Sequence, residues 1–209
     1  MVTRCGALTV VLLAGGPATR LPGKLALDVS GEPMLLRSIR RLTDLGWPCV
    51  ISVRTPLAIP LTMPSPDDVD WEVVTDDVAD GGPLGGLCSA ARKARTPLLF
   101  AAAGDLPNLS AAFASDLLEA YDALRPRTPA AVLPTWPDGH VEPLAALYDR
   151  DALVHGATTA LSAGKRKVTA ALEGLDVLAY PVGPEHEATL LNVNTPQDYE
   201  RLRTSVAQQ

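Results

Sequence analysis

The chain is poor in cysteine, and it carries no excess of positive charge. Its three cysteines, Cys5, Cys49 and Cys88, form no Cys-x-x-Cys pair. This pattern argues against a zinc site or a disulfide framework and favours reduced thiols, with Cys49 and Cys88 filling core space. The net charge of −6 argues against affinity for nucleic acid, because binding to a phosphate backbone needs a basic face. A polyanionic ligand therefore needs a local group of cations or a metal ion.

The sequence also lacks an apolar run of the roughly 18 residues that would span a membrane. Residues 7–14 are apolar and follow Arg4, which faintly resembles a signal peptide, but they run directly into Gly15 and Gly16. We therefore interpret this stretch as a first strand, and we expect a cytoplasmic protein that does not bind a membrane. A length of 209 residues suits one hydrophobic core, so residues 1–209 are predicted to form a single domain.

Short apolar segments alternate with amphipathic segments along the chain. Strands are predicted where β-branched residues and leucines run together, and helices where apolar residues recur at helical spacing. The predicted strands cover residues 9–13, 49–53, 71–74, 97–103, 130–134, 144–148 and 177–181, and the predicted helices lie within 31–46, 84–94, 111–124, 152–161 and from 196 onward. The alternation predicts an α/β fold in which helices cover both faces of a mostly parallel sheet.

Local signals mark some of the boundaries between these elements. Ser110 is predicted to be the N-cap of the helix that follows it. Thr195, Pro196 and Asp198 resemble a capping box with proline at the first helical position, which predicts the start of a C-terminal helix. Residues 54–70 contain too many prolines for a regular element and are interpreted as a connector.

Polar residues follow three of the predicted strands. Ligands of such folds bind beyond the carboxyl ends of the strands. Gly15 and Gly16 follow the first strand, Asp76 follows the strand at 71–74, and Asp105 follows the strand at 97–103. We therefore expect these three segments to meet at one edge of the sheet and to form a ligand site there.

The segment at residues 12–27 combines two glycines, Gly15 and Gly16, with Arg20 and Lys24. Adjacent glycines let backbone N–H groups approach a ligand closely, and two cations on the same loop suit a polyphosphate. Four of the 18 basic residues are lysines, so a lysine in a glycine loop is an informative feature. The spacing matches neither the Rossmann fingerprint nor the P-loop. An ordinary turn with two solvated cations fits this stretch about as well.

The acidic residues near the strand ends suggest different roles. Asp105 stands alone at the end of a predicted buried strand, which suits Mg²⁺ held by one carboxylate, substrate phosphates and water. The alternative is a carboxylate that only caps a turn. Asp76 lies nearest to its strand and is the best candidate for a nucleotide contact. Asp77 and Asp80 are expected to be solvated.

Two further groups of polar residues leave two interpretations each, and a third group has one. His140 and Glu142 precede a predicted strand and belong either to a site or to a surface hairpin. The basic residues 165–167 form either a second anion site or a solvated face. Asn192 and Asn194 are interpreted as bracing the turn and capping the last helix.

Seven segments, which together cover nearly the whole chain, resemble the MobA-type nucleotidyltransferases, the molybdenum cofactor guanylyltransferases, and occur in the family's order. They are "LLAGG" with the downstream Arg20 and Lys24, "VSGEPML", "VVTDDVADGGPLGGL", "FAAAGDLP", "EPLAALY", "AGKRKV" and "LNVNTP". The resemblance implies a three-layer, Rossmann-like nucleotidyltransferase fold. It also implies Mg²⁺ on Asp105, catalytic roles for Lys24, Arg20 and Asp105, and GTP bound by Leu13, Ala14, Gly15, Gly16, Lys24 and Asp76.

The implied reaction transfers GMP from GTP to the terminal phosphate of molybdopterin and releases pyrophosphate. A phosphate monoester is largely ionised at neutral pH, so the nucleophile needs no general base and catalysis depends on alignment and charge neutralisation. The resemblance also implies transient contact with proteins that donate the cofactor or receive it as molybdoenzymes.

The chain departs from the family pattern in two places. The loop before Lys24 is shortened to Leu21-Pro22-Gly23, and the second strand ends in Ser52-Val53-Arg54 in place of an asparagine-containing segment. A related transferase that uses CTP or a sugar phosphate therefore stays an alternative. A non-catalytic nucleotide-binding module is a further alternative, favoured by the short loop and opposed by the presence of Lys24 and Asp105.

Overall fold

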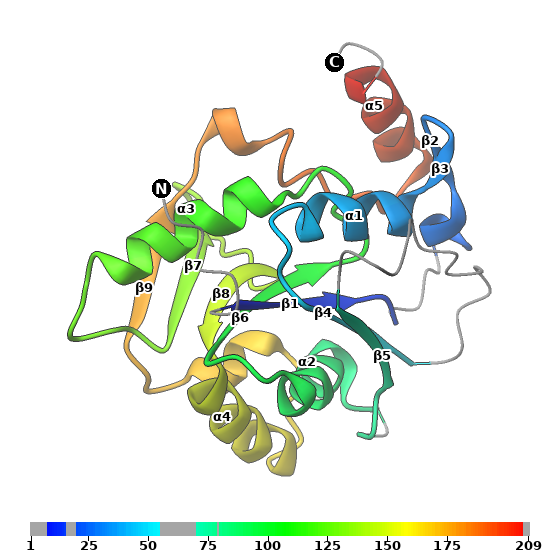
Figure 1. Cartoon of the computed structure of the whole chain (residues 1–209). Coiled ribbons are helices and arrows are strands. Elements are labelled where there is room, and N and C mark those ends of the chain that lie inside the picture. Colours follow the sequence, from blue (N-terminus) through cyan, green and yellow to red (C-terminus); the bar gives the residue numbers. More distant parts are fainter. Residues whose placement is uncertain (1–7, 16–19, 55–69, 79, 207–209) are drawn as a thin grey trace.

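The computed structural model describes residues 8–15, 20–54, 70–78 and 80–206. A seven-stranded sheet in the order β5-β4-β1-β6-β8-β7-β9 forms the centre of this described part (Figure 1). The strands of the sheet are β1 (Leu8–Leu13), β4 (Cys49–Val53), β5 (Trp71–Thr75), β6 (Leu98–Ala103), β7 (Ala131–Thr135), β8 (Ala145–Asp149) and β9 (Val177–Pro181). All seven were predicted, and each boundary agrees to within one residue.

The sheet is mostly parallel, as predicted. β1 pairs in parallel with β4 and β6, β4 pairs in parallel with β5, and β7 pairs in parallel with β9. β8 runs antiparallel to both of its neighbours, β6 and β7. Among these seven strands, β8 alone is therefore reversed, and the direction of a single strand is a feature that hydrophobic periodicity does not encode.

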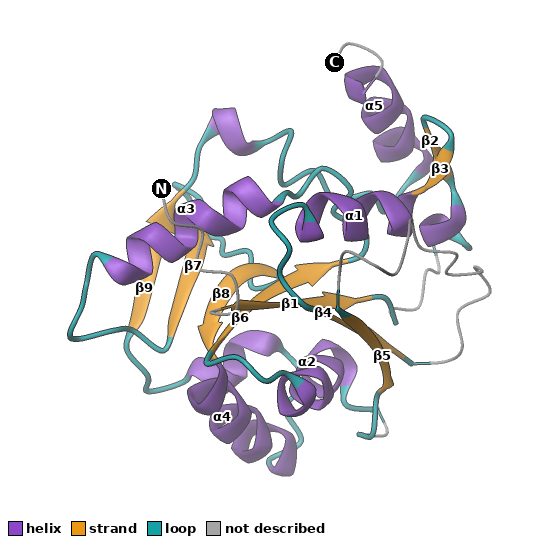
Figure 2. Cartoon of the chain, in the orientation of Figure 1, coloured by secondary structure: helices purple, strands orange, loops and turns teal. Residues whose placement is uncertain are grey.

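Helices cover both faces of the sheet, which confirms the predicted three-layer arrangement. Figure 2 shows α1 and α3 on one face, and α2 and α4 on the other. The helices are α1 (Met34–Thr43), α2 (Gly82–Lys93), α3 (Ala111–Asp122), α4 (Arg150–Ser162) and α5 (Pro196–Val206), with short 3-10 turns η1 (Lys24–Ala26), η2 (Val168–Leu172) and η3 (Pro184–His186). α2 and α4 begin two residues earlier than predicted, because Pro83 fits the first turn of α2 and Asp149 caps α4.

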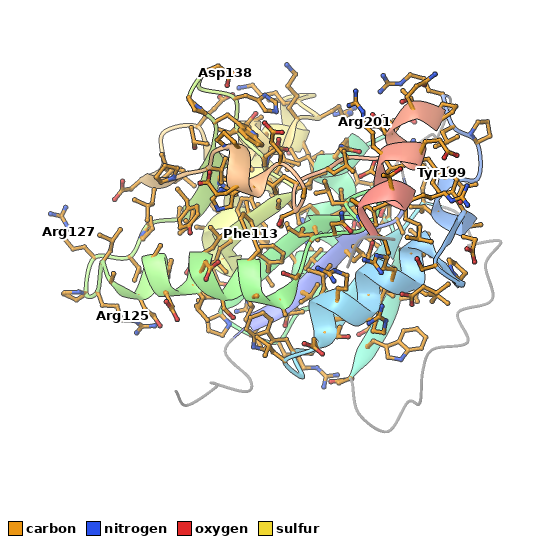
Figure 3. All side chains as sticks on the ribbon, turned by 90° about the horizontal axis from the view of Figure 1, so that it is seen from above. Phe113, Arg125, Arg127, Asp138, Tyr199 and Arg201 are labelled. Carbon is orange, nitrogen blue, oxygen red and sulfur yellow. The ribbon has the colours of Figure 1, made fainter. Side chains whose placement is uncertain are left out.

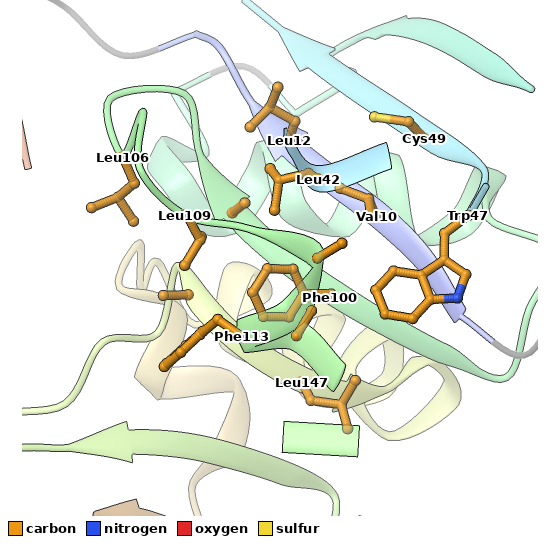
Figure 4. Close-up of a cluster of buried hydrophobic side chains, with 14 of the residues drawn as sticks. Val10, Leu12, Leu42, Trp47, Cys49, Phe100, Leu106, Leu109, Phe113 and Leu147 are labelled. Carbon is orange, nitrogen blue, oxygen red and sulfur yellow. The ribbon is translucent and has the colours of Figure 1, made fainter. Parts of the chain in front are cut away.

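Alternating side chains of the strands divide the core between the two faces. Val10 and Leu12 of β1 pack on the side of α1 and α3, together with Phe100 and Phe113 (Figure 4). Val11, the residue between them, packs on the side of α2 and α4. Both clusters are buried because the sheet presents apolar side chains on both of its faces, as a parallel sheet between two helical layers requires.

α5 lies outside the two helical layers, beside a short hairpin that the sequence did not predict. The hairpin consists of β2 (Asp28–Val29) and β3 (Glu32–Pro33). Tyr199 of α5 donates a hydrogen bond from its hydroxyl to the carbonyl of Asp28, and Figure 3 shows Tyr199 beside this hairpin. Leu202 is fully buried against Val29 and Met34. This small cluster holds the C-terminal helix close to the segment that carries Lys24.

Two of the three cysteines lie in the hydrophobic core. Cys49 and Cys88 are buried free thiols, which confirms that they fill core space; Cys5 lies outside the described residues. Burial raises the pKa of the Cys49 thiol to about 12. In the part of the chain that is described, no helix combines the length and the apolar character needed to cross a membrane.

Candidate active site

β5, β4, β1 and β6 run in parallel and end at one edge of the sheet, which we call the carboxyl edge. Backbone hydrogen bonds join the segments that follow these strands. Ala14 donates to the carbonyl of Ser52 over 2.8 Å, and Asp76 donates to the carbonyl of Val53 over 2.9 Å. Gly104 donates to the carbonyl of Leu13 over 2.9 Å. The predicted meeting at one edge is therefore confirmed for the end of β1, Asp76 and the Asp105 loop.

Lys24 and Asp105 contact each other directly at this edge. Lys24 begins η1, and its Nζ donates to Oδ2 of Asp105 at a distance of 2.5 Å. The two side chains are 12% and 19% exposed, so water screens the pair only in part. Sequence analysis selected both residues separately but did not predict their contact, which spans 81 positions of the chain.

Asn194 completes this group, which we call the Lys24 cluster: Lys24, Asp105 and Asn194. The Nζ of Lys24 also donates to Oδ1 of Asn194 over 2.7 Å. The backbone N–H of Val193 donates to the carbonyl of Asp105 over 2.9 Å and docks the last loop against the Asp105 loop. Asn192 is exposed, and its Oδ1 accepts a hydrogen bond from Asn194. The interpretation of the two asparagines as turn braces was therefore incomplete.

The capping box that precedes α5 fixes the backbone next to Asn194. Oδ2 of Asp198 accepts from the backbone N–H groups of Asn194 and Thr195 over 3.1 and 2.9 Å, and Asp198 N–H donates back to Oγ1 of Thr195. This reciprocal pattern confirms the predicted capping box. It also contains the signal that sequence analysis missed: Thr195 and Asp198 already cap the helix, so the side chain of Asn194 is left for another role.

Asp76 lies at the carboxyl edge beside Ser52, a residue that sequence analysis did not select. Ser52 is 2% exposed, and its hydroxyl donates to Oδ1 of Asp76. A Cβ placed on Gly86 of α2 would lie 2.9 Å from Oγ of Ser52 and 3.0 Å from Oδ1 of Asp76. Glycine at position 86 therefore leaves room for this pair of side chains. Asp77 is exposed as expected, although Ser89 donates a hydrogen bond to it.

The glycine loop is described only in part. Leu13 and Ala14 lie at the end of β1, and a Cβ placed on Gly15 would lie 2.8 Å from the backbone nitrogen of Arg54, so the close approach of β1 and β4 requires glycine there. Gly16 lies outside the described residues. Arg20 is exposed and makes no hydrogen bond or ion pair with the residues that the structure describes, so its catalytic role stays a prediction.

Comparison with known proteins assigns the chain to a family. A family model described as the MobA-like NTP transferase domain matches residues 10–177. The chain belongs to this family. The resemblance seen in the sequence is thereby confirmed, and the chain is a nucleotidyltransferase.

Two relatives and one solved structure show how far the similarity extends. A probable molybdenum cofactor guanylyltransferase of Natronomonas pharaonis is 30% identical over 211 residues, covering 95% of this chain and 98% of that protein. A molybdenum cofactor guanylyltransferase of Burkholderia vietnamiensis is 36% identical over 169 residues, covering 78% and 80%. The crystal structure of molybdopterin-guanine dinucleotide biosynthesis protein A from Archaeoglobus fulgidus shares the fold, with a TM-score of 0.75, 24% identity and coverage of 96% and 100%.

The donor set of this MobA-like enzyme fits a magnesium ion only in combination with substrate phosphates. Lys24 occupies Oδ2 of Asp105, and no described residue donates a hydrogen bond to Oδ1. Within the described ranges, no group of three or more histidine, cysteine or acidic side chains converges. Mg²⁺ is commonly held by one or two carboxylates together with phosphates and water, so Asp105 alone is sufficient protein ligation.

The other polar segments that the sequence singled out in this MobA-like enzyme, residues 140–142 and 165–167, make hydrogen bonds and ion pairs outside the Lys24 cluster. Glu142 accepts from the indole N–H of Trp136 over 2.9 Å and lies 3.5 Å from Nε2 of His140, in a surface hairpin between β7 and β8. The hairpin interpretation of this segment is therefore confirmed. Lys165 pairs with Glu173. Arg166 is exposed, and its backbone carbonyl accepts from the N–H of Leu84 in the first turn of α2.

Proposed function

We propose that this nucleotidyltransferase transfers GMP from GTP to the terminal phosphate of molybdopterin and releases pyrophosphate. The observation that carries the proposal is the Lys24 cluster, which places an ammonium group beside a carboxylate at the carboxyl edge, next to the end of β1. Relatives that are 30% and 36% identical carry the name molybdenum cofactor guanylyltransferase. The names support the substrates, and the geometry supports the type of reaction.

The nucleotide would bind across the carboxyl edge. The main chain at Leu13, Ala14, Gly15 and Gly16 would approach the phosphates, and Lys24 would donate to them. Asp76 would accept from the base or from a ribose hydroxyl, because Ser52 occupies only one of its two oxygens. A polar group matched to one base is left unpaired with another base, so this contact would also contribute to the choice of GTP.

Asp105 would hold a Mg²⁺ ion together with the phosphates of the nucleotide. When bound there, the ion would neutralise negative charge on the phosphates. Lys24 would then exchange its contact with Asp105 for a contact with a phosphate. Asn194 would still accept from Lys24 and would limit how far the ammonium group moves.

The chemistry then depends on alignment. The terminal phosphate of molybdopterin, ionised at neutral pH, would attack the α-phosphorus of GTP. The new P–O bond forms as the bond between the α-phosphorus and the bridging oxygen breaks, and the electron pair leaves with pyrophosphate. Lys24 and Arg20 would stabilise the charge that builds up on the leaving oxygens. Proteins that supply molybdopterin or accept the finished cofactor would contact the enzyme transiently.

Pyrophosphate release by the purified enzyme tests this proposal. The enzyme would be incubated with Mg²⁺, molybdopterin and each of the four nucleoside triphosphates in turn. We expect release with GTP at a rate at least about 10-fold above the rates with the other three, a difference of about 1.4 kcal/mol. Faster release with CTP, or release only with a sugar phosphate as acceptor, would replace the proposed substrates. Nucleotide binding without release would show a non-catalytic module.

A further inference from the structure

Asn108 is a buried asparagine three positions after Asp105, and it connects three separate segments of the chain. It is 6% exposed. Its Nδ2 donates to the carbonyl of Ala188 over 3.0 Å, and its Oδ1 accepts from Nη2 of Arg37 at 3.5 Å. Its backbone carbonyl accepts from Nη2 of Arg41 over 3.1 Å. We call these four residues the Asn108 clamp.

Each connection of the Asn108 clamp leads to the Lys24 cluster. Asn108 shares a short loop with Asp105, and Ala188 precedes Asn194 in the segment between η3 and α5. That segment touches the Asp105 loop a second time, through the hydrogen bond from Val193 to the Asp105 carbonyl. The clamp therefore holds together the two segments that place a carboxylate and an amide on Lys24, and it anchors both to α1.

The arginines of the clamp depend on Asn108 for their hydrogen bonds. Arg37 is 6% exposed, and the Nε atoms of Arg37 and Arg41 are buried without a partner among the described residues. Glu32, the nearest carboxylate, lies 3.9 Å from Nη1 of Arg37 and is bound more closely by Arg40, at 2.5 Å. The two oxygens of Asn108 therefore accept from guanidinium groups that have few other acceptors, and buried donors are costly to leave unpaired.

We propose that Asn108 is a positioning residue for nucleotidyl transfer, which keeps Asp105 and Asn194 where both contact Lys24. The inference rests on the proposed function, because it concerns the metal and phosphate contacts of the same site. A displacement of about 1 Å in such a group can cost about 100-fold in rate. Ala14 and Asp76 are held by other hydrogen bonds, to Ser52 and Val53, so nucleotide affinity should depend little on Asn108.

Thr96 provides a matched control for a purely structural role. It is 6% exposed, the same fraction as Asn108. Its hydroxyl lies 2.6 Å from that of Thr9 and donates to the carbonyl of Leu98 over 2.8 Å. These residues lie where β1 and β6 begin, at the opposite edge of the sheet from the Lys24 cluster. Thr96→Val therefore removes a comparable buried hydrogen bond far from the site.

The experiment compares Asn108→Leu, which keeps the branched shape of the side chain and removes its polar atoms, with Thr96→Val. Both should lower the melting temperature by about 2–8 °C, because each loses buried hydrogen bonds. Asn108→Leu alone should lower the kcat for pyrophosphate release by about 10-fold and weaken Mn²⁺ binding in the presence of GTP by about 10-fold. Its KM for GTP should stay within about twofold of the wild-type value.

The proposal requires kcat and Mn²⁺ affinity to fall together. It is overturned if Asn108→Leu matches Thr96→Val in both, or if only one of them changes. If the wild-type enzyme transfers no nucleotide, the proposed function fails, and the Mn²⁺ titration alone decides the role of Asn108. If Asn108→Leu does not fold, Arg41→Gln removes one hydrogen bond of the clamp; a fall in kcat of about threefold supports the proposal and an unchanged kcat overturns it.

Discussion

Lys24 donates to a carboxylate and to an amide, and the triphosphate of a nucleotide would offer it a third partner. In the structure its Nζ lies 2.5 Å from Asp105 and 2.7 Å from Asn194. A metal ion at Asp105 would therefore compete with the ammonium group for the negative charge of this carboxylate. The phosphates of a bound nucleotide would remove this competition, because they would attract both cations. Metal and nucleotide should consequently bind with positive coupling.

Replacement of Lys24 should separate metal binding from catalysis. Without nucleotide, Lys24→Met should bind Mn²⁺ about 10-fold more tightly than the wild-type enzyme, because Asp105 loses its resident cation. With nucleotide, its turnover should fall, because a fixed cation no longer faces the leaving oxygens. Titration calorimetry with Mn²⁺ measures the first effect, and Lys93→Met, an exposed lysine of α2, is the matched control. Unchanged or weaker Mn²⁺ binding by Lys24→Met would contradict the competition.

Sequence analysis could select Lys24 and Asp105 because each has a local signal. Lys24 follows a glycine loop, and Asp105 follows an apolar strand. Their contact could not be predicted, because it depends on how segments 81 positions apart meet in the folded chain. Asn194 is farther away still, at 170 positions from Lys24, and its side chain resembles that of any turn asparagine until the fold is known.

The ends of the strands and the first turn of α5 position the side chains of the candidate site. The capping box of α5 was predictable, because Thr195 and Asp198 are three positions apart. The same box fixes the backbone of Asn194, and the side chain of Asn194 accepts a hydrogen bond from Lys24. The reversed direction of β8 was not predictable, since a buried strand has the same apolar pattern in either direction.

Asp198→Ala should destabilise the first turn of α5. The difference in stability between the variant and the wild-type protein should depend on pH. Hydrogen bonds, chiefly from Thr195, lower the pKa of the Asp198 carboxyl. A lowered folded-state pKa means that the stabilisation is complete above the unfolded value of about 3.9 and is lost as pH falls through the folded value. We expect Asp198→Ala to cost about 1 kcal/mol at neutral pH. The melting temperatures of the two proteins should differ at pH 7, and the difference should shrink as the pH falls below the unfolded value of about 3.9. A difference that does not change with pH would contradict this role.

Gly156→Ala should disrupt the packing of α4 against η2. A Cβ at position 156 would lie 1.9 Å from the carbonyl oxygen of Ala171, a backbone atom that cannot rotate away. Relief of this contact requires the two elements to separate, so we expect a loss of about 1–3 kcal/mol in the free energy of unfolding. Denaturant titration measures this loss. Thr158→Ala, an exposed change on α4, is the control, and equal stability of the two variants would contradict the tight packing.

The protein as a whole is acidic, with a net charge of −6, and its candidate site lies at one edge of the sheet. The three-layer fold was predictable, because fully apolar strands between amphipathic helices must be covered on both faces. The position of the candidate site followed from the direction of the parallel strands. The choice of substrate depends on individual side chains at that edge, and similar folds host different reactions.

If nucleotidyl transfer takes place at the Lys24 cluster, it should depend on the carboxylate of Asp105. The rate of pyrophosphate release from GTP by Asp105→Asn, with molybdopterin present and Mg²⁺ in excess, measures this dependence. Asparagine keeps the shape of the side chain and removes its charge, so the melting temperature should change little. We predict a loss of at least about 100-fold in kcat, because a bound metal contributes several kcal/mol to the stabilisation of transition-state charge. A rate close to that of the wild-type enzyme would contradict this dependence.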